Sequence, residues 1–272
     1  DALMLGIKPE RQRAMMEESL DAIIRLMSDP EPYTVKTDWF EMNDAVLQLR
    51  PYQDPIVPVA VASVESPAGV TLAGKHGASI LSLSVPRDTI RKTSLAELWS
   101  IAEETAAEHG KEMHREDWGV VMGMHLAETK EQAMKDIRES SANLVTEYFG
   151  ETLGNPVPDV PRDQIVDYMV DHNQWIVGTP DDCIAGIERL QEITGGFGKF
   201  MIRVEDWAPR DKIHRSYELL ARYVMPHFQG SLEGIRISRD WASDRKEALQ
   251  QNRYAGIKAA TDRFDAGRSN GR

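Results

Sequence analysis

The chain has 272 residues, of which 41% are hydrophobic, so it can bury a large core in one or two domains. It carries 32 Lys and Arg against 44 Asp and Glu, a net charge of −12, which argues against a nucleic-acid or anionic-membrane surface and suits a soluble enzyme. No stretch approaches the roughly 20 apolar residues of a membrane span. The single cysteine, Cys183, excludes an internal disulfide and indicates the reducing cytoplasm.

The first predicted elements precede a regular strand–helix pattern. Apolar residues at helical spacing predict a helix over residues 8–27, which the sequence Asp-Pro-Glu-Pro ends. Two short β-like runs around Asp38 then predict a hairpin or excursion over residues 33–49, not a core strand.

From residue 57 onward, apolar strands alternate with helices. Continuous apolar runs with few charges are typical of fully buried parallel strands. We expect parallel strands, adjacent in chain order, at 57–63, 78–85, 118–126 and 199–204. We expect helices between and after them at 65–76, 94–109, 129–149, 163–172, 180–194 and 210–225, the last ended by Pro226. This alternation predicts a parallel sheet, either doubly wound or a (β/α)8 barrel, for which four of eight strands are counted.

The tail, residues 229–272, is charged and helix-compatible. It is too short and too charged to hold a core of its own, so we expect it to pack on the barrel or on a second subunit. Its candidate contacts are Trp241, Leu249, Tyr254 and Ile257.

The sequence Ser63-Val64-Glu65-Ser66 lies where a predicted strand meets a helix start. Small hydroxyl residues and free backbone N–H groups at such a junction favour a bound anion. The ordinary alternative is a plain N-cap, because Ser66 followed by Pro67 satisfies that pattern alone. A binding role for Glu65 must use its backbone N–H, since its carboxylate repels a phosphate.

Other candidate residues have structural explanations that compete with functional ones. Ser82 and Ser84 share one face of a buried strand and either bind a ligand or hydrogen-bond within the fold. His125, with Glu128 after it, is a possible general base, but a histidine satisfied near the sheet rim is favoured. Cys183 lies inside a helix and is expected to be a buried structural thiol. No metal-ligand spacing is present.

Five segments, in the same order, resemble the bacterial-luciferase-like flavin monooxygenases, and the match runs from about Lys8 to Phe228. The long tail further resembles the limonene 1,2-monooxygenase-like branch. The segments are ERQRAMMEESLDAIIRLM, FEMNDAVLQLRPYQDP, VAVASVESPAGVTLAGKHGASILSLS, VGTPDDCIAGIERLQEITGGFGKFMIRV and YELLARYVMPHF.

The resemblance implies a fold and a cofactor site. The expected fold is α/β, a luciferase-like (β/α)8 barrel of which this chain, starting at Asp1, holds about the last four βα units in residues 1–228, with 229–272 as a helical tail. In the family, the turn after the fifth strand binds the flavin phosphate. The matching positions here are Ala62, Ser63, Glu65, Ser66 and Gly69. No catalytic residue is assigned.

The resemblance also implies an activity. The expected enzyme is a two-component monooxygenase that inserts one oxygen atom of O2 into a small apolar substrate (a terpene, alkane or ketone) through a flavin C4a-peroxide. The cofactor is FMN, or alternatively FAD, reduced by a separate NAD(P)H-dependent reductase. We expect a cytoplasmic homodimer with neither nucleic acid nor membrane as partner, and little activity from this span alone. The alternatives are an F420-dependent oxidoreductase on the same fold, and a non-catalytic truncated chain.

Overall fold

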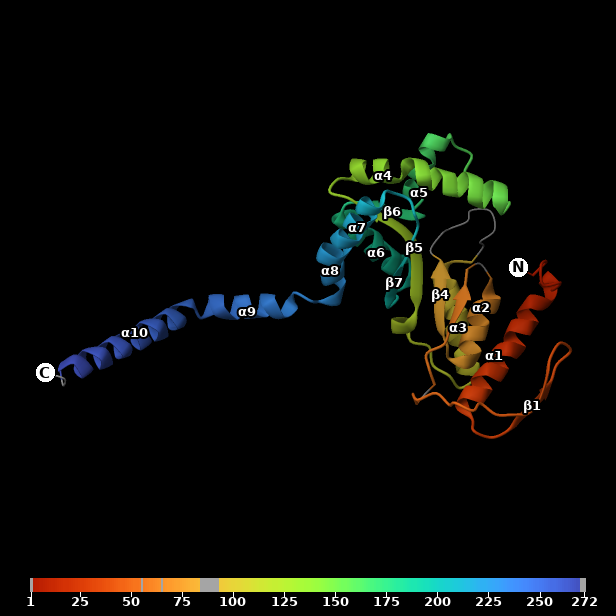
Figure 1. The fold of residues 1–272 in the computed structure, drawn as a ribbon, viewed down its shortest axis with the longest axis horizontal. Helices are drawn as coiled ribbons and strands as arrows, with labels where there is room; N and C mark the ends of the chain where they lie inside the picture. The colour runs from red at the N-terminus through yellow and green to blue at the C-terminus, as the bar shows by residue number, and fades with distance from the viewer. Residues whose placement is uncertain (1, 55, 65, 84–92, 270–272) are drawn as a thin grey trace.

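The structure is a computed structural model that describes residues 2–54, 56–64, 66–83 and 93–269. Its centre is a parallel sheet of five strands (Figure 1). The strands are β3 (Ala60–Ser63), β4 (Ser79–Leu83), β5 (Gly119–Leu126), β6 (Trp175–Gly178) and β7 (Lys199–Arg203).

The four expected core strands are parallel and adjacent in the expected order. β3 pairs with β4, β4 with β5, and β5 with β7, with Leu81 opposite Gly119 and Val121 opposite Met201. A further strand, β6, lies before Thr179 where no strand was predicted, and it pairs in parallel with the second half of β5. Within the described residues, β3 and β7 each pair with one strand, so this part of the chain forms an open sheet. The complete barrel stays a prediction.

Helices cover one face of the sheet. The main core joins the strand residues Ile80, Val120 and Met122 to apolar side chains of the helices on that face. These helices are α2 (Pro67–His76), α3 (Leu95–Glu108), α6 (Pro180–Thr194) and α7 (Arg210–Leu219). Two of these helices begin with a capping box: Ser94 with Glu97 starts α3, and Thr179 with Asp182 starts α6.

The opposite face is largely uncovered along β3, β4 and β7. We call it the open face, and it carries Ala62, Leu81, Val121 and Met201, which the strand pairing places on one side of the sheet. Ala62 is exposed and Met201 is 38% exposed. Apolar residues are thus exposed on this face, as expected for four strands that do not close a barrel.

A second core covers the sheet near the end of β5. It joins Trp175 and Val177 of β6 to α4 (Lys130–Asn143) and α5 (Ile165–Asp171). α4 continues without a break as the π-helix η3 (Leu144–Thr152), and the 3-10 helix η4 (Arg162–Gln164) precedes α5. The 3-10 helix η2 (Arg115–Asp117) leads into β5.

The chain before β3 forms a helix and a hairpin, as predicted. η1 (Pro9–Arg11) leads into α1 (Gln12–Ser28), and β1 (Tyr33–Lys36) pairs antiparallel with β2 (Glu41–Ala45). α1 lies beside α2, since Lys75 of α2 forms ion pairs with Glu17 and Asp21 of α1 at 2.9 Å.

The end of the chain departs from the prediction. α7 continues as the π-helix η5 (Leu220–Val224) and then as α8 (Met225–Gln229), so Pro226 does not end the helix. Pro226 lies in the first turn of α8, directly after the π-helical turn η5. Gly230, in the left-handed region with φ of +63°, ends α8 instead.

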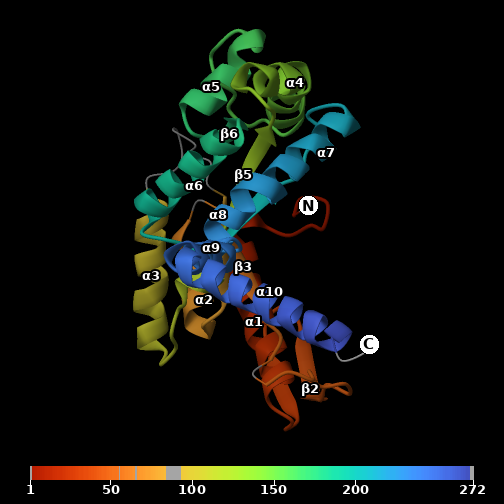
Figure 2. The ribbon, with the colours of Figure 1, turned by 90° about the vertical axis from the view of Figure 1, so that its left-hand side faces the viewer.

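Two further helices, α9 (Glu233–Asp244) and α10 (Lys246–Ser269), project away from the rest of the molecule (Figures 1 and 2). Every residue from Gln229 to Arg268 is exposed except Ala242, which is half-buried. The expected packing of the tail on its own barrel is therefore not seen in the described residues, and packing on a second subunit stays a prediction. Within the described residues, no helix has the length and apolarity needed to cross a membrane.

Candidate functional site

The carboxyl ends of the parallel strands form the candidate site. In parallel α/β folds, ligands collect at this edge, because the loops and helix N-termini that follow the strands meet there. Two features lie at the edge: the turn between β3 and α2, and a recess beside the ends of β5 and β7.

The turn between β3 and α2 brings together four of the five predicted cofactor residues, Ala62, Ser63, Ser66 and Gly69. Ser63 ends β3 with 3% of its surface exposed, and its hydroxyl donates a long hydrogen bond of 3.5 Å to the carbonyl of Ser66. Ser66 occupies the N-cap position of α2 in extended conformation, but its hydroxyl makes no capping hydrogen bond. Within the described residues, the Ser66 side chain therefore does not cap the first-turn N–H groups of α2, and this helix end is where a bound anion is favoured.

Gly69 sets the distance between this helix and the strand. A Cβ at residue 69 would lie 3.0 Å from the Ala62 carbonyl oxygen and 3.1 Å from the Ser63 hydroxyl, tighter than ordinary contact. Ala62 contributes this carbonyl and turns its methyl to the open face. Glu65, the fifth predicted residue, lies outside the described residues, as does Ser84.

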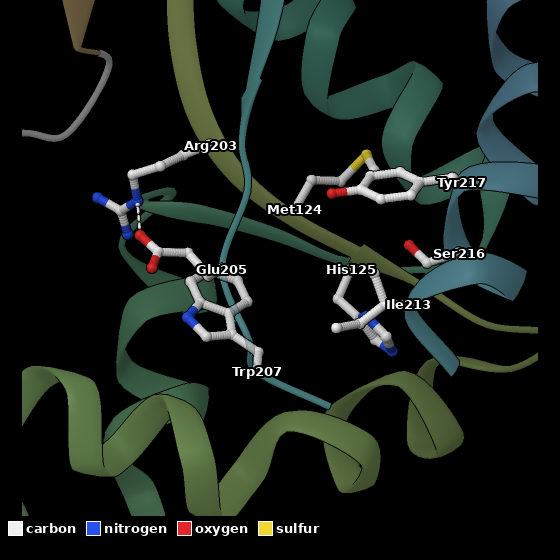
Figure 3. A pocket seen from close by; sticks show the side chains of 8 residues that line it. All are labelled: Met124, His125, Arg203, Glu205, Trp207, Ile213, Ser216 and Tyr217. Carbon is white, nitrogen blue, oxygen red and sulfur yellow. Dashed lines mark ion pairs between the residues drawn. The ribbon is translucent and has the colours of Figure 1, made fainter. Parts of the chain in front are cut away.

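Sequence reasoning missed the recess at the ends of β5 and β7. It has an aromatic and aliphatic wall and a charged rim, and α7 closes one side (Figure 3). The signal was present in the polar and aromatic run Arg203-Val204-Glu205-Asp206-Trp207 directly after the last strand. Its lining residues are Met124, His125, Arg203, Glu205, Trp207, Ile213, Ser216 and Tyr217.

An ion pair occupies the rim of the recess. Arg203 Nε lies 2.5 Å from Glu205 Oε1, the contact drawn dashed in Figure 3. The Arg203 guanidinium also lies over two aromatic rings, 5.8 Å from Phe149 of η3 and 6.0 Å from Trp207. These contacts hold the cation in place through cation–π attraction as well as charge.

Two tryptophans fill the sheet surface next to the recess. The rings of Trp175 and Trp207 lie 4.4 Å apart above Gly123, where a Cβ would approach Trp207 to 2.5 Å. Both indole N–H groups are buried without a hydrogen-bond partner among the described residues. Only glycine at position 123 leaves room for this pair.

His125 is tied to α4. The histidine is 3% exposed, and its Nε2 lies 3.5 Å from Asp136 Oδ2, which belongs to a carboxylate that also accepts from Gln132. Burial lowers the pKa of His125 despite this carboxylate, so the ring is neutral at pH 7. Glu128 pairs instead with Arg215 at 2.7 Å. Nε2 is nevertheless buried without a hydrogen-bond partner among the described residues, so the expected histidine satisfied at the sheet rim is not what the structure shows.

Two other candidates have structural partners. Ser82 accepts a hydrogen bond of 3.1 Å from the Trp118 indole inside the core, so it is satisfied within the fold. Cys183 is fully buried against Met124, and burial raises the pKa of its thiol to about 12, as expected of a structural thiol. Among the described residues, no group of three His, Cys, Asp or Glu side chains is placed to hold a metal ion.

Residues 2–195 match the family model described as luciferase-like monooxygenase. The chain is 42% identical over 252 residues to 4-hydroxyprotoasukamycin monooxygenase of Streptomyces nodosus subsp. asukaensis, an alignment covering 91% of this chain and 67% of that protein. It is 40% identical over 278 residues to limonene 1,2-monooxygenase of Rhodococcus erythropolis, covering 99% of this chain and 68% of that protein. The chain thus spans about two thirds of the length of these relatives.

Solved structures share the fold at lower identity. The oxygenating constituent of 3,6-diketocamphane monooxygenase from Pseudomonas putida, in complex with FMN, has a TM-score of 0.64 and 19% identity over 83% of this chain and 67% of that chain. An F420-dependent secondary alcohol dehydrogenase, with an F420-acetone adduct, has a TM-score of 0.57 and 19% identity over 82% of this chain and 64% of that chain. These two structural neighbours thus hold FMN and an F420 adduct, respectively.

Proposed function

The chain belongs to the luciferase-like monooxygenase family, and on that premise we propose that it takes part in a flavin-dependent monooxygenation of a small apolar substrate. Its curated relatives are monooxygenases, which supports an oxidoreductase. The observation that carries the flavin proposal is the geometry at the start of α2. The Ser66 side chain does not cap this helix, and Gly69 lets the first turn of the helix lie close to the end of β3.

The residues at this turn fit a flavin phosphate. The hydroxyls of Ser63 and Ser66 and the first N–H groups of α2 are donors, and the helix dipole is positive there. Gly69 keeps the helix start close to the strand end, so that the donors converge. Ala62 and the backbone of Glu65 complete the proposed set.

When bound, reduced FMN supplies the reaction with O2, and the protein supplies binding, orientation and exclusion of water. We place the substrate at the recess, whose Met124, Trp207, Ile213 and Tyr217 side chains suit an apolar molecule. The same proposal includes a separate NAD(P)H-dependent reductase that supplies the reduced flavin. It also includes FAD as the alternative flavin and a cytoplasmic location. Turnover by residues 1–272 alone is expected to be low.

Ser66 provides the test. We compare Ser66→Ala and Ser66→Asp by anaerobic equilibrium titration with reduced FMN and, in parallel, with reduced riboflavin, which lacks the phosphate. One charge-assisted hydrogen bond is worth about 1.5–3 kcal/mol, so Ser66→Ala should weaken FMN binding by roughly 10- to 100-fold. Ser66→Asp should weaken it further, because its carboxylate repels the phosphate and competes for the same N–H groups.

Riboflavin and a second helix start provide the controls. Riboflavin affinity should change little in either variant, and Thr179→Asp, at the N-cap of α6, should leave both affinities intact. If Ser66→Asp stays folded and binds reduced FMN as tightly as the parent, the turn is only a helix cap.

An F420-dependent hydride transfer is the second candidate, because a dehydrogenase of that kind shares the fold. The same titration with F420 separates the two: tight F420 binding with weak FMN binding favours the dehydrogenase. A non-catalytic chain binds neither cofactor.

A further inference from the structure

We propose that α9 and α10 form an arm that binds the body of a second copy of this chain. The arm is defined as residues 229–269, and the body as the described residues before it. This inference is independent of the flavin proposal, since it uses no residue of the strand edge.

In the described residues, one side of α9 carries apolar side chains that no other part of the chain covers. Ile237 and Trp241 lie four residues apart, and Ile235 and Ala242 lie seven apart; the two pairs flank Gly234 and Ser238 and together span about 160° of the helix circumference. Arg236, Arg239, Asp240, Ser243 and Asp244 occupy the other side. Eight large apolar side chains of the arm are at least 41% exposed: Leu232, Ile235, Ile237, Trp241, Leu249, Tyr254, Ile257 and Phe264.

Such helices need a partner to be stable. Isolated helices of one or two dozen residues are marginal in water, and most helical stability comes from packing an apolar face. α9 has 12 residues and α10 has 24, and none of them is buried by the body of the same chain. Figures 1 and 2 show both helices projecting away from the body.

Charge favours the body of a second copy as that partner. Residues 229–272 carry nine Lys or Arg against six Asp or Glu, a net charge of +3, whereas residues 1–228 carry a net charge of −15. Arm and body therefore attract each other, while two arms repel each other, which disfavours a dimer built from arms alone.

The size of the arm also suits this role. At 1.5 Å per residue, α9 and α10 together extend about 54 Å, enough to cross a neighbouring body. A standard interface uses about 20–30 residues from each side, and the two helices supply 12 and 24. A reciprocal exchange, in which each copy receives the arm of the other, closes a two-fold dimer and leaves no arm free.

The first experiment measures the mass of the full chain in solution by light scattering at 50 µM. We expect twice 30.6 kDa for the parent. Trp241→Asp, on the apolar side of α9, should give 30.6 kDa, whereas the matched control Ser243→Asp, on the polar side, should keep the dimer. Raising NaCl from 50 to 500 mM should weaken the dimer at least fivefold, because salt screens the attraction between arm and body.

The second experiment identifies what the arm contacts. Arg253→Cys on the arm and Glu103→Cys on α3 are labelled in separate populations, since the buried Cys183, whose thiol has a pKa raised to about 12, does not compete for the label. After mixing, we expect energy transfer between the arm of one copy and the body of the other.

Three results would overturn the proposal. A parent of 30.6 kDa at 50 µM would show that the arm has no second copy as partner. A dimer that survives Trp241→Asp, with helix content unchanged by circular dichroism, would place the interface elsewhere. Energy transfer in a chain that carries both labels, with none between the separately labelled populations, would show that the arm folds back.

Discussion

His125 gives the molecule a pH-dependent contribution to stability. Burial lowers its pKa in the folded protein, an effect that Lys212 adds to and Asp136 opposes. Folding therefore favours the neutral ring, so the stability associated with His125 is complete above its unfolded pKa of about 6.5 and falls as the pH drops below that value. Partial burial also lowers the pKa of the half-buried His76, which lies beside Asp21, Lys75 and Lys111, and this group contributes with the same sign.

We predict that the parent has a higher free energy of unfolding than His125→Gln at pH 8. This difference should shrink as the pH falls to 5. Glutamine fills much of the same space but cannot be protonated. The measurement is a series of urea unfolding curves at pH 8, 7, 6 and 5 for both proteins, with His172→Gln, an exposed histidine, as control. Parallel stability curves for parent and His125→Gln would mean that the ring does not titrate in this range.

At the scale of single residues, side-chain contacts can be predicted from the sequence when the two partners are near each other in the chain. Ser94 with Glu97 and Thr179 with Asp182 are three residues apart, and their capping boxes form. The contacts of Arg203 with Phe149 and of Gly123 with Trp207 join distant segments. No local pattern could predict these contacts, so the recess was missed although its residues follow a predicted strand.

At the scale of elements, glycines set how closely the helices pack. A Cβ on Gly74 in α2 would lie 2.5 Å from the Ala102 carbonyl oxygen and 3.1 Å from the Ala106 N of α3. These are backbone atoms, so they cannot move aside like a flexible side chain. The two helices approach this closely only because residue 74 has no side chain.

We predict that Gly74→Ala lowers the free energy of unfolding by about 1–3 kcal/mol, because it forces α2 and α3 apart. The control is Gly256→Ala in α10, where a Cβ meets nothing within 4 Å. That change should stabilise the helix by roughly 0.5–1 kcal/mol, since alanine is the better helix former. Both are measured by urea unfolding; a Gly74→Ala chain as stable as its parent would mean that the α2–α3 contact is loose.

The elements also show where a sequence pattern fails. The four-residue β6, Trp-Ile-Val-Gly, is too short to show any period, and its pairing with β5 depends on residues some 50 positions away. Pro226 was expected to end a helix, but the π-helical turn η5 before it lets a new helix begin there. Long apolar strands and capped helices, in contrast, were predictable because their signals are local and repeated.

At the scale of the whole molecule, two hydrophobic clusters meet at β6, which pairs with β5 and contributes Ile176 to the main core. The main core includes Leu98 of α3, 1% exposed, and the second core includes the fully buried Ile137 of α4. β5 contributes Val120 and Met122 to the main core, and its second half pairs with β6, whose Trp175 and Val177 belong to the second. A continuous strand should couple the two clusters, because neither can unfold without breaking the hydrogen bonds of β5.

We therefore predict that Leu98→Ala and Ile137→Ala each lower the free energy of unfolding by about 2–5 kcal/mol in one cooperative transition. The measurement is hydrogen exchange followed by mass spectrometry, read separately for peptides from α3 and from α4, beside urea unfolding by circular dichroism. If the two clusters are coupled, either substitution lowers the protection against hydrogen exchange in both peptides, and by the same free energy. If Ile137→Ala exposes α4 while α3 keeps its full protection, then β5 does not transmit stability, and the region around α4 and α5 opens by itself.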